Sequence, residues 1–394
     1  MDRFTKSFTA QAPLPPESLD AARRVLESAA LHRYGAAPSE AALLEREFAQ
    51  WQGAPYCLAV ASGGQAMQIA LRAAGVGPCD AVLTNAFTLA PVPGAIAAVG
   101  ARPRLVEIGE DLRIDADDLA AKAPGAKALL LSNMRGHLSD MDRVRAVCEA
   151  EGVALIEDCA HTMGAAWDGV KSGNHGLAGC FSTQTYKHMN SGEGGLLVSP
   201  DAEFIARATL LSGSYMLYDR HGAGPSAEAF EAPRWDTPNM SARMDELRAA
   251  VLRPQLTLLD ADCAAWRALH ARMTAAMEGA ATLPRRPGKE TPVGSSFQFR
   301  APSFTADQCI ALVDRAGARG VPLKWFGAAE PTGFTSTHGS WRYVERHDLP
   351  QTDTVLATLM DLRLPLTFDG SDADLIARIL REEIEAVAGA AGEI

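Results

Sequence analysis

The chain has 394 residues, of which 47% are hydrophobic and 22% charged, a composition typical of globular proteins and a length that favours two domains over one simple core. Its net charge of -11 disfavours nonspecific binding to nucleic acid or to an anionic membrane. The seven cysteines contain no CxxC pair and the N-terminus has no apolar leader-like segment, so we expect no disulfide framework, no metal site, no membrane span and a cytoplasmic location.

Short apolar runs alternate with helical patterns from about residue 55 to residue 200. Amphipathic stretches at Ala66–Ala74, Met141–Ala150 and Ala202–Leu211 are predicted helices. Near-continuous apolar strands separated by helices predict an α/β fold, a three-layer α/β/α arrangement around a mostly parallel seven-stranded sheet that binds ligands at the carboxyl ends of its strands. The predicted strands are Tyr56–Ala61, Ala81–Ala86, Arg104–Ile108, Ala128–Ser132, Val153–Glu157, Cys180–Thr183 and Gly195–Val198.

The remainder of the chain predicts a smaller α+β unit. Residues 212–238 form a long Gly- and Pro-rich loop, and a long helical pattern then runs from near Met244 past Trp266 with a kink at Pro254. Residues 284–292 link it to a strand at Ser296–Arg300, a helix at Ala306–Arg319, and closing helices near 352–361 and 372–388. We therefore expect a large domain at 1–250, with an N-terminal arm at about 1–20, and a small domain at 251–394.

The most informative segment is residues 181–195, FSTQTYKHMNSGEGG. Lys187 follows a predicted strand end and precedes the glycine-rich turn Gly192–Gly195, while Asp158 ends the apolar run Ala154–Ile156. A lysine and an acid at neighbouring strand ends are what a pyridoxal 5'-phosphate (PLP) enzyme needs, because the amine forms a Schiff base and the acid keeps the pyridine nitrogen protonated. Taken singly, Lys187 would be a surface lysine and Asp158 an N-cap or a structural ion-pair partner.

A second set of residues is suited to the cofactor's phosphate. Ser62-Gly63-Gly64-Gln65 lies between a predicted strand and a predicted helix, where free backbone amides and the helix N-terminus favour an anion, although a plain tight turn fits equally well. Ser182, five residues before Lys187, could donate to the same phosphate. His161 either contacts the cofactor ring or serves as a structural partner.

In these segments the chain resembles the DegT/StrS-type family of PLP-dependent aminotransferases, also called sugar aminotransferases, of PLP fold type I. The similarity spans about residues 40 to 390. The motifs that carry it are Leu44–Ala49, Val60–Ala66, Asp140–Asp142, Ile156–His161, Phe181–Lys187 with Gly192–Gly195, and Arg243–Leu247.

The resemblance implies roles for individual residues. Lys187 would carry the cofactor and transfer protons, Asp158 would pair with the pyridine nitrogen, and the phosphate would be held by Gly63, Gly64, Gln65 and Ser182. In the family an asparagine reaches the phosphate across a dimer interface, and Asn239 is the nearest candidate here, with Ser241 in the usual place. The family's stacking aromatic falls at Leu89, its glutamine at His161, and its phosphate-turn threonine at Gly64.

The resemblance also implies the reaction. We expect a homodimeric aminotransferase that moves an amino group, with L-glutamate as the implied donor, to a keto-sugar or related ketone by a ping-pong mechanism through the Lys187 Schiff base. The alternatives are a PLP-dependent lyase or aldolase, or a PLP-binding protein with little turnover. Arg135 and Arg243 are candidate donors to a substrate carboxylate or phosphate, or else salt-bridge partners. Loop 212–238 and the aromatics of 325–343 either line the acceptor pocket or pack the small domain.

Overall fold

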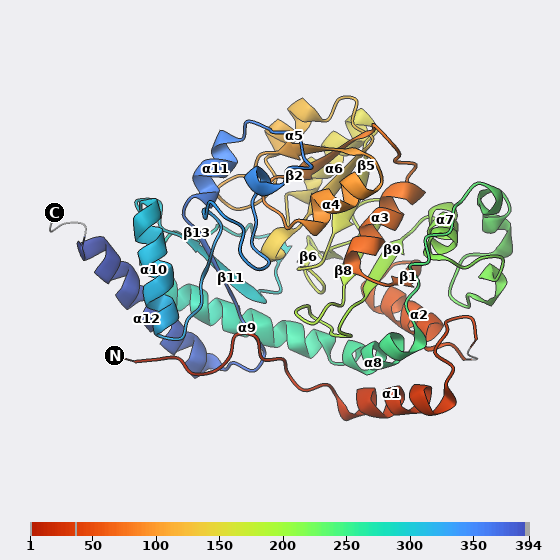
Figure 1. Cartoon of the computed structure of the whole chain (residues 1–394), viewed down its shortest axis with the longest axis horizontal. Helices are drawn as coiled ribbons and strands as arrows, with labels where there is room; N and C mark the ends of the chain where they lie inside the picture. Colours follow the sequence, from red (N-terminus) through yellow and green to blue (C-terminus); the bar gives the residue numbers. More distant parts are fainter. Residues whose placement is uncertain (1, 36–37, 391–394) are drawn as a thin grey trace.

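A seven-stranded sheet forms the centre of the larger part of the computed structural model, which describes residues 2–35 and 38–390 (Figure 1). In space the strands run β1-β9-β8-β5-β4-β2-β3, and β9 alone is antiparallel to its neighbours. Each strand begins and ends within two residues of its predicted bounds, and the predicted fold class is confirmed. The strands are β1 (Tyr56–Val60), β2 (Ala81–Asn85), β3 (Arg102–Val106), β4 (Ala128–Ser132), β5 (Ala154–Asp158), β8 (Ala178–Ser182) and β9 (Gly195–Ser199).

Helices cover both faces of this sheet because alternate strand residues are apolar on each side. Leu58 and Val60 of β1 pack toward one helical layer, whereas Cys57 and Ala59 pack toward the other. The first layer contains α3 (Gly63–Ala73), α4 (Pro91–Ala98) and α7 (Ala202–Ser212). The second contains α2 (Glu40–Gln52), α5 (Ala116–Lys122), α6 (Met141–Glu151) and α8 (Glu246–Leu256), and α1 (Pro16–Ser28) lies outside it against α8.

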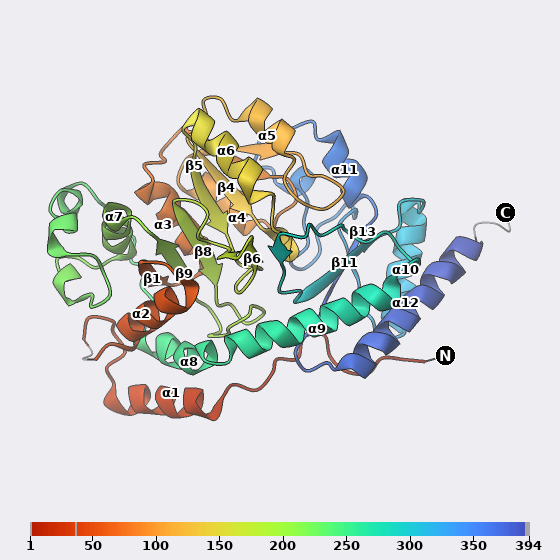
Figure 2. The same ribbon diagram turned by 180° about the vertical axis from the view of Figure 1, so that it is seen from behind.

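The segment after residue 244 forms two helices, so the prediction of one kinked helix is wrong. Helix α8 ends at Leu256, two residues after Pro254, and α9 (Leu259–Met277) begins after a short turn. Proline has no N–H for the helical ladder and collides with the carbonyl one turn earlier, so the last turn of α8 closes with tighter bonds such as Thr257 N–H to Pro254 O. Helix α9 then crosses from the large sheet to the second sheet (Figure 2).

That second sheet has the order β11-β13-β12 and is antiparallel. It packs one face against α9, α10 (Ala306–Ala318) and α12 (Gly370–Ala390). The predicted helix at 352–361 is wrong in its second half: α11 (Pro350–Leu356) is followed by a strand, because Leu359-Met360-Asp361-Leu362-Arg363 alternates with the period of two that a half-buried strand requires. The strands are β11 (Ser296–Arg300), β12 (Lys324–Trp325) and β13 (Leu359–Arg363), and a third small sheet joins β10 (Glu290–Thr291), β6 (Ala166–Trp167) and β7 (Val170–Lys171).

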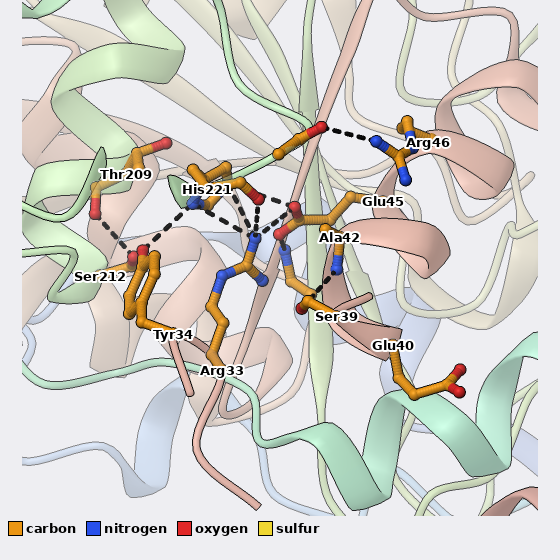
Figure 3. A network of polar contacts seen from close by, with 12 residues as sticks. Arg33, Tyr34, Ser39, Glu40, Ala42, Glu45, Arg46, Thr209, Ser212 and His221 are labelled. Carbon is orange, nitrogen blue, oxygen red and sulfur yellow. Dashed lines mark hydrogen bonds and ion pairs between the residues drawn. The ribbon is translucent and has the colours of Figure 1, made fainter. Parts of the chain in front are cut away.

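A buried ionic network holds the N-terminal segment, α2 and loop 212–238 together (Figure 3). Arg33 Nη2 lies 2.6 Å from Glu45 Oε2, and His221 Nε2 lies 3.2 Å from the same oxygen. The other Glu45 oxygen accepts the backbone N–H of Ala59 in β1 at 2.6 Å. Burial alone would raise the pKa of Glu45, but the charge of Arg33 together with His221 lowers it to about 2. Because a buried carboxylate is tolerated only when it is paired, this network fixes β1, and with it the start of α3.

Loop 212–238 holds three short 3-10 turns, η2 (Tyr218–Arg220), η3 (Ala227–Phe230) and η4 (Pro233–Trp235), and agrees with the predicted long loop. In the described part of the chain, no helix combines the length and the apolar character needed to cross a membrane. The predicted domains extend from residue 1 to residue 394, and their residues 1, 36–37 and 391–394 lie outside the described residues.

Candidate active site

The predicted site residues gather where β1, β4, β5 and β8 end. These strands run in the same direction, so their carboxyl ends meet at one edge of the sheet. Asp158 is the last residue of β5 and stands in register with Ser132 of β4 and Cys180 of β8. The chain therefore brings an acid from β5 beside the segment that follows β8.

Asp158 is buried and held in one orientation. Its Oδ1 accepts the N–H of Ala160 at 3.1 Å, and its Oδ2 accepts the hydroxyl of Ser132 at 3.1 Å. Ser132 in turn accepts the Thr88 hydroxyl at 2.7 Å. Burial raises the pKa of Asp158, while the Ala160 N–H, Lys187 and Ser132 oppose the rise. A carboxylate in this setting gains from a cationic partner, such as a protonated ring nitrogen.

Lys187 lies in the turn that joins β8 to β9. The turn is closed by the bond from Thr183 N–H to Gly194 O (3.0 Å) and that from Lys187 N–H to Gln184 O (2.8 Å). Burial lowers the pKa of the Lys187 ammonium to about 7 although the charge of Asp158 raises it, and Arg135 adds to the lowering. A lysine with this pKa holds a large fraction of neutral amine near pH 7, which is the nucleophilic form.

His161 contacts the amine directly. Its Nε2 lies 2.9 Å from Lys187 Nζ, and the backbone N–H of Arg135 points at its Nδ1 at 3.4 Å. Burial and the neighbouring charges of Lys187 and Arg135 hold the pKa of His161 well below its usual value, so the ring is neutral. An Nδ1 that accepts leaves the proton on Nε2, which then donates to the neutral amine of Lys187. The structure thus places His161 beside Lys187, and its contact with the cofactor ring stays a prediction.

The turn predicted to bind the phosphate, Ser62-Gly63-Gly64-Gln65, leads into α3. This helix begins at Gly63, three residues before its predicted start. Ser62 caps the helix by accepting the Gln65 N–H at 3.1 Å. A Cβ on Gly63 would lie 2.9 Å from Cβ of Ser182, and one on Gly195 would collide with the backbone of Ser62, so both glycines are required for this packing. At Gly64 a Cβ would lie 3.7 Å from Ser62 Oγ, an ordinary contact, so close packing does not demand glycine there.

These residues fit PLP. The open N-terminus of α3 and Ser182 can hold a phosphate. Asp158 can pair with a ring cation, and Lys187 can bond to the aldehyde carbon. Ser182 Oγ accepts the Gln184 N–H at 3.3 Å, which leaves the hydroxyl proton of Ser182 free to donate to such a phosphate.

A cavity of about 270 Å³ adjoins Lys187. Leu89, His161 and Arg135 line it, whereas Phe87 turns away and packs against Phe326 with ring centroids 5.1 Å apart. Of the five aromatics predicted to line the acceptor pocket, Phe334 alone lines this cavity. Trp325 donates to Ala357 O of the small unit, whereas Phe326, Trp341 and Tyr343 contact residues that follow or belong to strands of the large sheet.

Asp158, Ser182 and the Gly63–Gln65 turn do not line this cavity, and neither do the predicted residues Asn239, Ser241 and Arg243. Asn239 and Ser241 are exposed and bond to each other, with Ser241 N–H donating to Asn239 Oδ1 at 2.9 Å. Arg243 donates to Gly213 O at 2.7 Å and lies over the Tyr215 ring at 5.7 Å. Arg243 therefore contacts loop 212–238, and within the described residues it does not form the salt bridge that was its predicted alternative.

Sequence reasoning missed nine lining residues of this cavity: Phe8, Thr9, Gln184, Tyr186, Pro322, Leu323, Lys324, Leu362 and Arg363. The alternation around Asp361 and Arg363 was a usable signal, because charged residues at every second position of an apolar strand share one face.

Comparison with known proteins identifies relatives over most of the chain. The sequence model of the DegT/DnrJ/EryC1/StrS aminotransferase family matches residues 14–381. The 3-amino-5-hydroxybenzoate synthase of Amycolatopsis mediterranei (strain S699) is 33% identical over 79% of this chain and 80% of its own length. The L-glutamine:2-deoxy-scyllo-inosose aminotransferase of Streptomyces fradiae is 31% identical over 69% of this chain and 65% of its own. The crystal structure of a 3-amino-5-hydroxybenzoic acid synthase superposes with a TM-score of 0.82 at 26% identity, covering 96% of this chain and 98% of that one.

Proposed function

Because the chain belongs to the DegT/DnrJ/EryC1/StrS aminotransferase family and is a PLP-dependent transaminase, we propose that it moves an amino group from L-glutamate or L-glutamine to a ring ketone such as a keto-sugar or keto-cyclitol. The acceptor class is supported by relatives whose names specify an amino-glucose, an inosose and an aminohydroxybenzoate. The donor is supported by the inosose aminotransferases, whose names specify L-glutamine.

PLP supplies a pyridinium ring that accepts the electron pair left when a proton leaves the substrate's α-carbon. In this proposal Lys187 Nζ binds the cofactor covalently and, once released by the incoming amine, takes and returns the α-proton. Asp158 holds the ring nitrogen protonated. The backbone amides of Gly63 and Gly64 and the side chain of Gln65 bind the phosphate together with the Ser182 hydroxyl.

His161 keeps Lys187 neutral and oriented, and Leu89 takes the position of the ring-stacking side chain. The observation that carries the proposal is the cluster at one sheet edge. A half-buried lysine with a pKa of about 7 lies 2.9 Å from a neutral histidine and beside a buried carboxylate. A surface lysine or an ordinary structural ion pair would not have these properties.

Borohydride reduction of the PLP-loaded protein tests the covalent role. We expect a reduced adduct on the peptide that contains Lys187, and none in Lys187→Ala, while Lys289→Ala, at an exposed position, keeps it. An adduct on another residue would refute the assignment. Glutamate and glutamine are then supplied singly, and pyridoxamine phosphate is quantified after its release; neither donor forming it would refute the proposed donors.

Three further predictions are proposed with this function. A second copy of the chain covers the exposed Tyr215, Met216 and Trp235 of loop 212–238, and Asn239 or Ser241 of each copy reaches the partner's phosphate. Light scattering should give twice the chain mass, and Asn239→Ala should weaken PLP binding.

A cytoplasmic location is supported by seven unpaired cysteines. The boundary between the two domains near residue 250 is supported by the helix break at 257–258.

A further inference from the structure

The second sheet turns a polar face toward Lys187. Lys324 of β12 and Gln298 of β11 are the cross-strand partners of Asp361 in β13. Arg363 lies two residues further along β13 and therefore points to the same side. The opposite face carries Met360 and Leu362 into the apolar core. One face of a three-stranded sheet thus presents charged groups where the large sheet ends.

Arg135, from the turn after β4, completes this group. Its Nη2 lies 2.9 Å from Asp361 Oδ2, and Lys324 Nζ lies 3.7 Å from the same oxygen. The other Asp361 oxygen already accepts the Gln298 amide at 2.8 Å. Three cations therefore face a single carboxylate. Among the described residues that line the cavity none is acidic, while Arg135, Lys324 and Arg363 all line it.

The donors of these cations are incompletely used. Arg135 is 7% exposed, and within the described chain its Nε has no hydrogen-bond acceptor, while its Nη2 is engaged only in the ion pair with Asp361. Arg363 lies 4.3 Å over the Tyr186 ring and makes a weak bond of 3.3 Å to the Tyr186 carbonyl. Buried donors without acceptors are costly, and an anionic ligand in the cavity would satisfy them.

We infer that Arg135, Lys324 and Arg363 form an anion subsite for a carboxylate of the ketone acceptor, so that the acceptor is a carboxylate-bearing ketone. The inference rests on the proposed function and specifies its substrate class. In a ping-pong reaction the donor leaves before the acceptor enters the same cavity. With a neutral acceptor, one buried and two half-buried cations would share a single carboxylate, which is unfavourable. A carboxylate of the acceptor at the same place restores the pairing.

The test uses the enzyme loaded with pyridoxamine phosphate, the form that meets the acceptor. Calorimetry gives Kd for cyclohexanecarboxylate and for cyclohexanecarboxamide, which has nearly the same shape without the charge. We expect the carboxylate to bind at least about tenfold more tightly, because charge-assisted bidentate bonds exceed neutral ones. Lys324→Gln and Arg363→Gln should each lose most of this ratio. Arg207→Gln, an exposed ion-pair partner on α7, is the matched control and should keep it.

A second ligand separates the acceptor from the donor. Glutarate carries the two carboxylates of glutamate without its amine, and its Kd is measured with the same variants on the PLP-loaded form. Equal Kd values for cyclohexanecarboxylate and cyclohexanecarboxamide overturn the inference. This includes the case in which the variants change the Kd of glutarate alone, because the cations then serve only the donor. If cyclohexanecarboxylate still binds more tightly than the carboxamide but neither glutamate nor glutamine converts PLP to pyridoxamine phosphate, the proposed donors are refuted and the anion subsite is supported.

Discussion

Replacing His161 with leucine is expected to raise the pKa of Lys187 in the cofactor-free protein. The Nε2 proton of His161, 2.9 Å from Lys187 Nζ, has an acceptor only when the amine is neutral. Leucine removes this donor and keeps the surroundings apolar. Burial therefore continues to lower the pKa, and only the contribution of the hydrogen bond is lost.

The size of the shift follows from that bond. A hydrogen bond contributes roughly 0.5–1.5 kcal/mol, and one pKa unit corresponds to about 1.36 kcal/mol, so we expect a rise of about 0.4 to 1 unit. Lys187, with a pKa of about 7, is about half neutral at pH 7. In His161→Leu the neutral fraction at pH 7 should fall to about 0.1–0.3.

Competitive acylation with a trace of acetic anhydride between pH 6 and pH 10, followed by mass spectrometry of the lysine peptides, measures this pKa. In the wild type the labelling rate of Lys187 should level off above about pH 8. Lys289, whose pKa is raised by its bond to Asp142, should keep climbing and is the internal control. The reasoning is refuted if Lys187 also climbs steadily to pH 10, or if His161→Leu leaves its midpoint unchanged or lowers it.

Three other changes have defined outcomes. Gly195→Ala forces a Cβ against the Ser62 backbone, so we expect a lower Tm and weaker PLP binding. The control Gly389→Ala, in the open part of α12, should be neutral or stabilising. Equal Tm values for the two variants would contradict this reasoning. Glu45→Gln leaves Arg33 buried without its anion and should cost about 3–5 kcal/mol. Since the folded pKa of Glu45 is about 2 against an ordinary 4.5, its stabilisation is complete above pH 4.5 and is lost as pH falls toward 2; acid titration of Tm should show that slope in the wild type and not in the variant. Leu89→Tyr should tighten PLP binding by about 2- to 12-fold through ring stacking, and equilibrium dialysis showing no change would exclude Leu89 from the ring face.

The sequence alone determined the central sheet and the core of the candidate site. Apolar runs of strand length that alternate with helical patterns predict a mostly parallel sheet. Asp158 and the Ser62 turn directly follow such predicted strands, and Ser182 lies near the end of another. Because parallel strands end at one edge, their meeting could be inferred without a distance.

Helix boundaries near proline and in the small unit could not be read in this way. The helical pattern continues through Pro254, and only the packing of α8 against the large sheet and of α9 against the second decides where the break falls. Residues 359–361 suit either a helix or a strand until β11 and β12 pair with them. Pairing of this kind depends on partners far away in the chain, so local preference is a weak guide.

Tertiary structure alone decided which charges meet around Lys187. Lys324 and Asp361 become neighbours through strand register, and Arg135 joins them only because the second sheet docks at the end of the first. The hydrogen bond between His161 and Lys187 likewise joins two loops that follow different strands. A repeating pattern along the chain specifies which face a residue takes. Which residue lies opposite depends on register and docking, and these are settled by packing energy summed over contacts remote in sequence.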